Sequence, residues 1–166
     1  ISYKKPGDLI VCLGSLNGTL GGSEFLKTIH GKIEGPLHNF DIKSELDIQA
    51  LCLYGIREGL INSAHDLSDG GLSVAIAESV ISSSNDLGAY INIESKLSER
   101  EVLFGECPSI IVVSLNEDSL YDLILLANKN DVNTQTIGRV TNDRTLIVND
   151  SININLYKEY FSSPED

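Results

Sequence analysis

Apolar and polar residues alternate along the chain in short blocks that predict a mixture of strands and helices. Continuous apolar blocks bounded by Gly, Pro or Asn are typical of buried strands. The expected strands cover residues 8–13, 86–93, 108–115, 135–140 and 145–148. The first and third of these are expected near the centre of a sheet, because they are apolar enough to be covered on both faces. The last two flank Asn142-Asp143 and are expected to pair as a hairpin.

Helical spacing of apolar residues predicts three main helices and two short ones. The main helices are expected at 41–59, at 72–83 and from Asn116 through Ala127, and the short ones at 23–30 and 97–104. The first main helix carries two apolar stripes and is expected to be well buried. Residues 152–161 predict a final strand or helical turn. The elements together predict an α+β or layered α/β domain, a mixed β-sheet covered by helices, without an interior boundary over 1–166.

Composition and charge exclude several classes of protein. The 166 residues include 12 Lys plus Arg against 24 Asp plus Glu, a net charge of −12. Such a surface repels phosphate backbones and anionic lipids, so neither nucleic acid nor membrane is an expected partner. Apolar runs fall short of the ~18 residues of a membrane span, and no signal-peptide core follows the first lysines, so a cytoplasmic protein is expected. The absence of Met, even at position 1, favours a fragment of a longer protein.

The three cysteines are expected to be reduced thiols in or near the core. Cys12, Cys52 and Cys107 are odd in number, far apart and flanked by apolar residues. No histidine stands near them in a nucleophile motif, which disfavours a catalytic thiol.

The segment 64–78 carries the clearest candidate chemistry. Asp66 and Asp69 lie beside Ser68 and the pair Gly70-Gly71, just where a helix is expected to begin. Free N–H groups at a helix start hold phosphate, and carboxylates hold Mg²⁺. On spacing alone a purely structural interpretation is favoured: Ser68 and Asp69 cap the helix, the glycines allow tight packing, and His65 is a near-core histidine.

Two further segments are weaker candidates. Glu106 precedes the strand at 108–115, where a carboxylate is either functional or a residue at the rim of the core. The loop 14–22 has four glycines in nine positions, which favours close approach of the backbone to a ligand. It contains neither the Gly-Lys-Ser of a P-loop nor a G-x-G-x-x-G pattern.

Three motifs in this order carry a family resemblance over essentially the whole chain. They are Leu-Gly-Gly-Ser-Glu-Phe at 20–25, Ala-His-Asp-Leu-Ser-Asp-Gly-Gly-Leu at 64–72 and Leu-Phe-Gly-Glu at 103–106. Together they resemble the C-terminal domain of the large subunit of phosphoribosylformylglycinamidine synthase, of the aminoimidazole ribonucleotide synthetase type. The resemblance implies part of a ligase of purine biosynthesis that converts formylglycinamide ribonucleotide, ATP and glutamine to formylglycinamidine ribonucleotide.

The resemblance also implies partners and site residues. The chain would be the last domain of the synthetase, working with the preceding domains, a glutaminase subunit or domain and a small accessory subunit. ATP and Mg²⁺ would be shared with the preceding domains, and no catalytic side chain is implied. The metal-binding residue would be Asp66, and the cofactor-binding residues would be Ser68, Asp69, Gly70, Gly71 and Glu106. Cys107-Pro-Ser-Ile stands where the family often has an Arg, which weakens anion contact beside Glu106.

Two alternatives remain open at this point. Related ATP-using proteins, namely aminoimidazole ribonucleotide synthetase, selenophosphate synthetase and a hydrogenase-maturation protein, have the same domain type. The chain could instead be a non-catalytic packing domain, which metal and nucleotide binding would distinguish. With four Arg and no P-loop, the isolated chain is expected to show neither ligase nor ATPase activity. An apolar face exposed by separation from other domains would favour self-association.

Overall fold

The computed structural model describes residues 1–83 and 86–156, which form one seven-stranded mixed sheet with helices on both faces. The strands are β1 (Leu9–Leu13), β2 (Ser63–Asp66), β3 (Gly88–Ile91), β4 (Ile111–Leu115), β5 (Thr134–Thr141), β6 (Thr145–Val148) and β7 (Ile152–Asn155). Their order is β2-β4-β1-β5-β3-β6-β7. β3 and β6 run parallel, whereas the other neighbours run antiparallel. The predicted mixed sheet is therefore confirmed.

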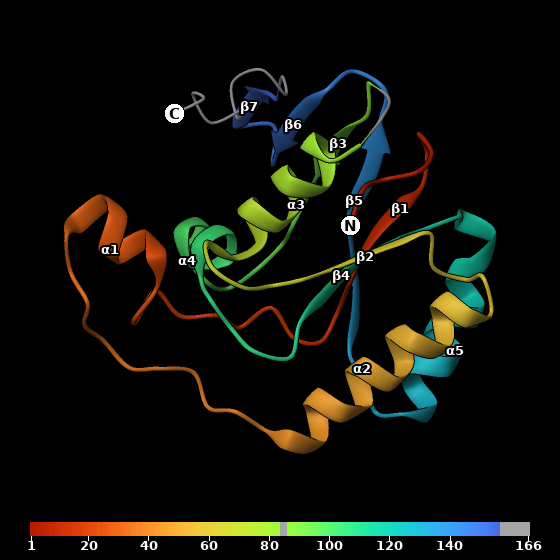
Figure 1. The fold of residues 1–166 in the computed structure, drawn as a ribbon, viewed down its shortest axis with the longest axis horizontal. Coiled ribbons are helices and arrows are strands. Elements are labelled where there is room, and N and C mark those ends of the chain that lie inside the picture. The colour runs from red at the N-terminus through yellow and green to blue at the C-terminus, as the bar shows by residue number, and fades with distance from the viewer. Residues whose placement is uncertain (84–85, 157–166) are drawn as a thin grey trace, which may run out of the picture.

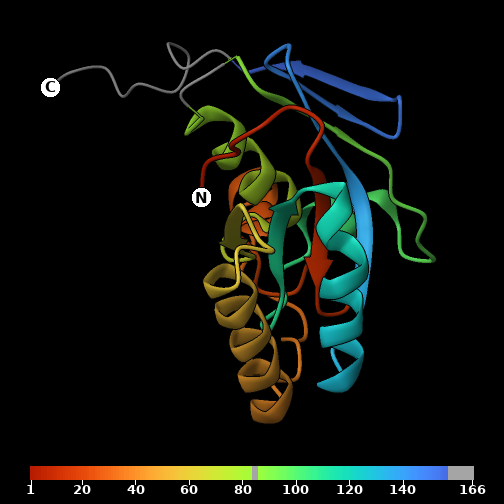
Figure 2. The same cartoon turned by 90° about the vertical axis from the view of Figure 1, so that its right-hand side faces the viewer.

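Within the described residues there are five α-helices, and all but the first form layers on the two faces of the sheet (Figures 1 and 2). They are α1 (Glu24–His30), α2 (Ile42–Arg57), α3 (Gly71–Ile81), α4 (Glu99–Phe104) and α5 (Leu120–Lys129), with a 3₁₀ turn at Glu117–Ser119. α2 and α5 pack on one face, where Val11 and Leu13 of β1 point. α3 and α4 pack on the other face, where Ile10 and Cys12 of the same strand point. Both faces of β1 are thus buried, as its apolar sequence predicts.

Capping residues explain where α1 and α2 begin and where α1 ends. The Ser23 hydroxyl accepts a hydrogen bond from the Leu26 N–H, and Gly31 ends α1 in the left-handed conformation. Asp41 caps α2 through the N–H groups of Lys43 and Ser44. These boundaries agree with the predicted helices at 23–30 and 41–59.

The sheet order corrects two predictions. β5 and β6 do not form a hairpin, because β3 lies between them and pairs with both. The chain does turn at Asn142-Asp143, but the strands before and after this turn both pair with β3, which lies far from them in the sequence. β4 is well buried, yet it lies second from one edge, and β5 occupies the middle position. The predicted last element forms only β7 within the described residues, and positions 157–161 lie outside them.

α2 is less buried than its two apolar stripes predict. One stripe, Ile48, Leu51 and Cys52, packs into the core. On the other stripe, Ile42, Leu46 and Leu53 are exposed. The prediction of a well-buried helix is therefore wrong for half of its apolar surface, because the sheet covers a single side of α2.

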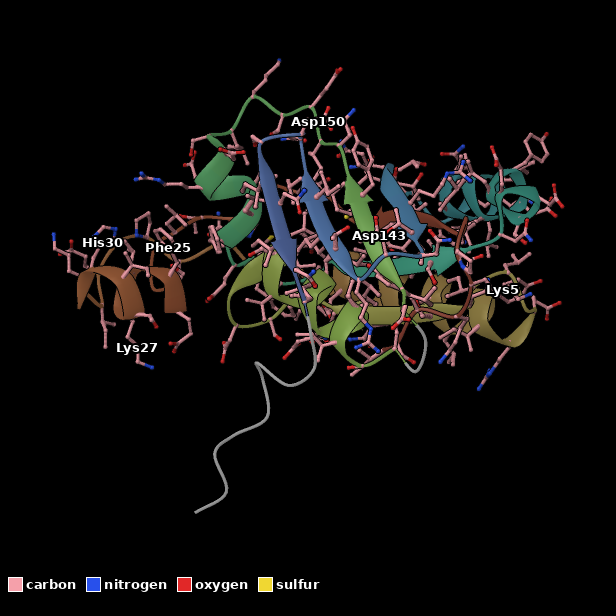
Figure 3. All side chains as sticks on the ribbon, turned by 90° about the horizontal axis from the view of Figure 1, so that it is seen from above. Lys5, Phe25, Lys27, His30, Asp143 and Asp150 are labelled. Atoms are coloured by element: carbon pink, nitrogen blue, oxygen red, sulfur yellow. The ribbon has the colours of Figure 1, made fainter. Side chains whose placement is uncertain are left out.

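α1 projects from one end of the molecule, and Figure 3 shows Phe25, Lys27 and His30 standing apart from the sheet. None of the residues of α1 is buried. Its main side-chain contact with the body is the Phe25 ring, stacked on Phe104 with ring centroids 4.9 Å apart. No helix within the described residues is long and apolar enough to span a membrane.

Candidate functional site

The three segments singled out in the sequence meet at one end of the α3 and α4 layer. Thr19 in the glycine-rich loop forms an isolated antiparallel bridge with Glu106. A Cβ on Gly18 would lie 2.7 Å from the Gly105 carbonyl carbon, and a Cβ on Gly71 would lie 2.8 Å from the Gly105 carbonyl oxygen. Three backbone segments therefore cross at distances that only glycine allows at these positions.

A pocket of about 270 Å³ opens where these segments cross. It is lined by Gly21, Gly22, Leu37, His38, Leu67, Ser68, Asp69, Glu106, Cys107 and Pro108. Four of the predicted site residues thus lie close together: Ser68, Asp69 and Glu106 line the pocket, and Gly70 bonds to Glu106. His38, which lies in the connection between α1 and α2, belongs to no motif that would have marked it.

The start of α3 at Gly70-Gly71 is not capped in the way that the structural interpretation of segment 64–78 predicts. Gly70 is the N-cap of α3, with φ +82°, and no side chain caps this helix. Ser68 and Asp69 are therefore not the caps of this helix, contrary to that interpretation. The Gly71 N–H donates instead to the Ser68 carbonyl at 3.1 Å, which closes a tight turn.

Glu106 occupies the position where a phosphate was predicted. Its Oε1 accepts hydrogen bonds from the Gly70 N–H at 2.8 Å and from the Glu24 N–H at 2.9 Å. The second of these donors stands at the first position of α1 and was not foreseen from the sequence. The N–H of Gly70, the residue that precedes the first turn of α3, is thus already bonded to a carboxylate of the same chain.

Asp66 lies outside this pocket. It ends β2, its side chain is 75% exposed, and it lines a neighbouring hollow of about 620 Å³ with Phe40 and Glu45. His65 beside it is buried, with Nε2 2.9 Å from a Glu78 carboxylate oxygen and Nδ1 2.8 Å from the Asp66 carbonyl oxygen. The interpretation of His65 as a near-core histidine with polar partners is confirmed.

Taken alone, these residues do not fit a complete site for a nucleotide and its metal ion. The pocket beside Glu106 holds two carboxylates, with His38 as the basic side chain among its lining residues. Lys27 of α1 is paired with Glu24 at 2.6 Å. Within residues 1–83 and 86–156, no three His, Cys, Asp or Glu side chains are grouped so that they could hold a metal ion. A triphosphate would find more negative than positive charge here.

The cysteines are free and buried, as predicted. Burial raises the pKa of the Cys12 thiol to about 12 and that of Cys107 to about 11. Since the thiolate is the reactive form, neither side chain is suited to act as a nucleophile near neutral pH.

Comparison with known proteins identifies the family. The model of "AIR synthase related protein, C-terminal domain" matches residues 5–151. The chain belongs to this family. A curated relative of this AIR synthase related domain, phosphoribosylformylglycinamidine synthase subunit PurL of Thermoanaerobacter sp. (strain X514), is 35% identical over 147 residues, which is 89% of the chain. The chain spans about one fifth of the length of that protein, 20%.

Solved structures agree on the fold of this AIR synthase related domain. Thermotoga maritima PurL complexed with FGAR superposes with a TM-score of 0.81 at 21% identity, over 99% of this chain and 29% of that one. The same protein complexed with ATP gives a TM-score of 0.72 at 21% identity, over 93% and 26%. The T. maritima PurLQS structure gives a TM-score of 0.73 at 19% identity, over 93% of this chain and 26% of that one. The predicted fold class is confirmed.

Proposed function

We propose that the chain is the C-terminal domain of the large subunit of a phosphoribosylformylglycinamidine synthase. The whole enzyme would convert formylglycinamide ribonucleotide, ATP and glutamine to formylglycinamidine ribonucleotide in purine biosynthesis. The observation that carries the proposal is the 35% identity to a PurL subunit over 89% of the chain. The fold is also that of a PurL solved with FGAR. The three free, buried cysteines support a reducing compartment, the cytoplasm.

In this proposal the domain supplies one wall of a site that other domains complete. Asp66 is the carboxylate that would face Mg²⁺, since its side chain is exposed beside the pocket. Ser68, Asp69, Gly70 and Gly71 would form the adjoining wall. ATP would be held with the preceding domains, because this chain offers it little positive charge. The ATP complex of T. maritima PurL supports nucleotide binding by the whole subunit.

A chimera tests the proposed function directly. The matched region of Thermoanaerobacter PurL is replaced by this chain, and FGAR-dependent phosphate release from ATP is measured with ammonium as the nitrogen source. We expect activity within about tenfold of the parent, and none for this chain alone or for the truncated PurL alone, since neither holds a complete site. Asp66→Ala in the chimera is expected to raise the Mg²⁺ concentration needed for half-maximal rate. A folded chimera without turnover would contradict the proposed activity. Unchanged Mg²⁺ dependence in Asp66→Ala would favour the packing domain.

The exposed stripe of α2 supports contact with the rest of the synthetase. Ile42, Leu46, Leu53 and Ile56 are 65%, 60%, 48% and 48% exposed. With Gln49 they are spaced 4, 3, 4 and 3 residues apart, which places them on one side of the helix. We propose that a preceding domain covers this stripe, and that an uncovered stripe promotes self-association. A glutaminase and a small accessory subunit complete the proposed assembly, supported by the PurLQS structure of T. maritima.

The double variant Leu46→Gln/Leu53→Gln tests that contact. Because both side chains are exposed, we expect the free energy of unfolding to change by no more than about 0.5 kcal/mol per site. Binding to a PurL subunit lacking its matched domain is expected to weaken at least tenfold in a titration. Tyr121→Gln, which removes a 72% exposed ring from α5, is the control and should bind normally. Equal binding by the double variant and the wild type would rule out the α2 stripe as the contact.

A further inference from the structure

Glu106 connects three segments that lie far apart in the sequence. Its backbone pairs with Thr19, through an N–H to carbonyl distance of 3.1 Å in one direction and 3.4 Å in the other. Its side chain binds the Gly70 N–H and the Glu24 N–H through the same oxygen, Oε1. The two side-chain bonds span 36 and 82 positions of sequence. Hydrogen bonds from backbone N–H groups to a carboxylate are shorter and stronger than those between neutral groups.

α1 depends on such specific contacts because the core does not hold it. None of its residues is buried, and it projects from the body of the molecule (Figure 1). The Phe25 stack on Phe104 fixes one side of the helix, and the Glu106 carboxylate fixes its first N–H. The loop residues Gly21 and Gly22, just before α1, line the same pocket as Ser68 and Asp69. The contacts that hold the start of α1 relative to Gly70 therefore determine the width of this pocket.

We propose that Glu106 is a positioning residue, a built-in anion that holds the first turn of α1 against the turn before α3 and so shapes the pocket between them. A carboxylate suits this position because two N–H groups converge on it from different elements. The same geometry means that Oε1 of Glu106 accepts from the N–H groups of Gly70 and Glu24 rather than being directed at a ligand. The role lies within this chain and goes beyond the proposed function, because it requires neither ATP nor any other domain.

Amide hydrogen exchange of the full chain, followed residue by residue by NMR, tests the proposal. In Glu106→Ala we expect the Gly70 and Glu24 amides both to exchange at least tenfold faster, since both lose one acceptor. In Glu106→Gln the side-chain amide oxygen keeps an acceptor in place without the charge. The exchange rates of both amides should then remain within a few fold of the wild-type rates. The chemical shifts of both amide protons should change. Glu94→Gln, at an exposed glutamate, removes the same charge and should leave both amides unchanged.

The outcomes separate bridging from a general loss of structure. Wild-type exchange at either amide in Glu106→Ala would overturn the proposal, because a bridge must release both donors. Faster exchange throughout the core in Glu106→Ala would show that this variant unfolds, and Glu106→Gln then decides. Proton shifts at Gly70 and Glu24 that are both unchanged in Glu106→Gln overturn the proposal, whereas shifts at both support it.

Discussion

Replacing Gly18 by alanine is expected to lower the free energy of unfolding by about 3 kcal/mol, the upper end of the usual cost of overpacking. The new Cβ would lie 2.7 Å from the carbonyl carbon and 2.8 Å from the carbonyl oxygen of Gly105. These are backbone atoms at the end of α4, so they cannot move aside as a flexible side chain would. Chemical denaturation followed by circular dichroism measures the change.

Gly31→Ala is the control that separates the cost of a steric clash from the cost of an unfavourable backbone conformation. Gly31 has φ +65°, but a Cβ there would meet nothing within 4 Å. The expected cost is therefore only that of a left-handed conformation, about 1 kcal/mol. A Gly18→Ala variant no less stable than Gly31→Ala would show that the loop 14–22 can retreat from Gly105.

Leu123→Ala is expected to destabilise the protein by about 3 to 5 kcal/mol. Leu123 is fully buried, at 0% exposure, in the layer between α5, α2 and the sheet. The truncation removes apolar contacts and leaves a cavity, because the neighbouring Gly55 of α2 has no side chain with which to fill it. The midpoint of urea unfolding is the measurement.

Leu125→Ala is the matched control on the same helix. Leu125 is 39% exposed, so the same chemical change should cost about 1 kcal/mol or less. Equal costs at the two positions would mean that α5 does not pack as described. The pair therefore tests the orientation of the helix as well as the depth of its core.

Periodicity located the helices and six of the seven strands but missed β2, and it did not show which surface each element buries. α3 buries the expected face of Leu72, Ala75, Ile76, Ser79 and Val80. α2 carries two apolar stripes, and nothing local distinguishes the stripe that faces the sheet from the exposed one. The predicted pairing of β5 with β6 is wrong for a related reason. The turn at Asn142-Asp143 is local, whereas the insertion of β3 between β5 and β6 depends on residues about fifty positions away.

The candidate site was predictable as a set of segments but not as a set of contacts. Ser68, Asp69 and Glu106, which only the family resemblance assigned to one site, line one pocket. The sequence could not show that the Gly70 N–H bonds to Glu106, since that bond depends on how three loops cross. Asp66 could be named from its motif, yet its separate hollow follows from the path of β2 at the edge of the sheet.

The sheet order also determines when the fold can close during synthesis. β1 pairs Leu9 with Leu115 and with Arg139, so the first strand of this domain obtains its partners only after most of the domain has been synthesised. Contacts this distant in sequence are slow to form, because the intervening loop must be ordered first. Until β4 and β5 emerge, both apolar faces of β1 have no sheet to join. While this domain is being synthesised, β1 therefore stays exposed until β4 and β5 have followed it, and a hydrophobic segment exposed in this way is prone to aggregation.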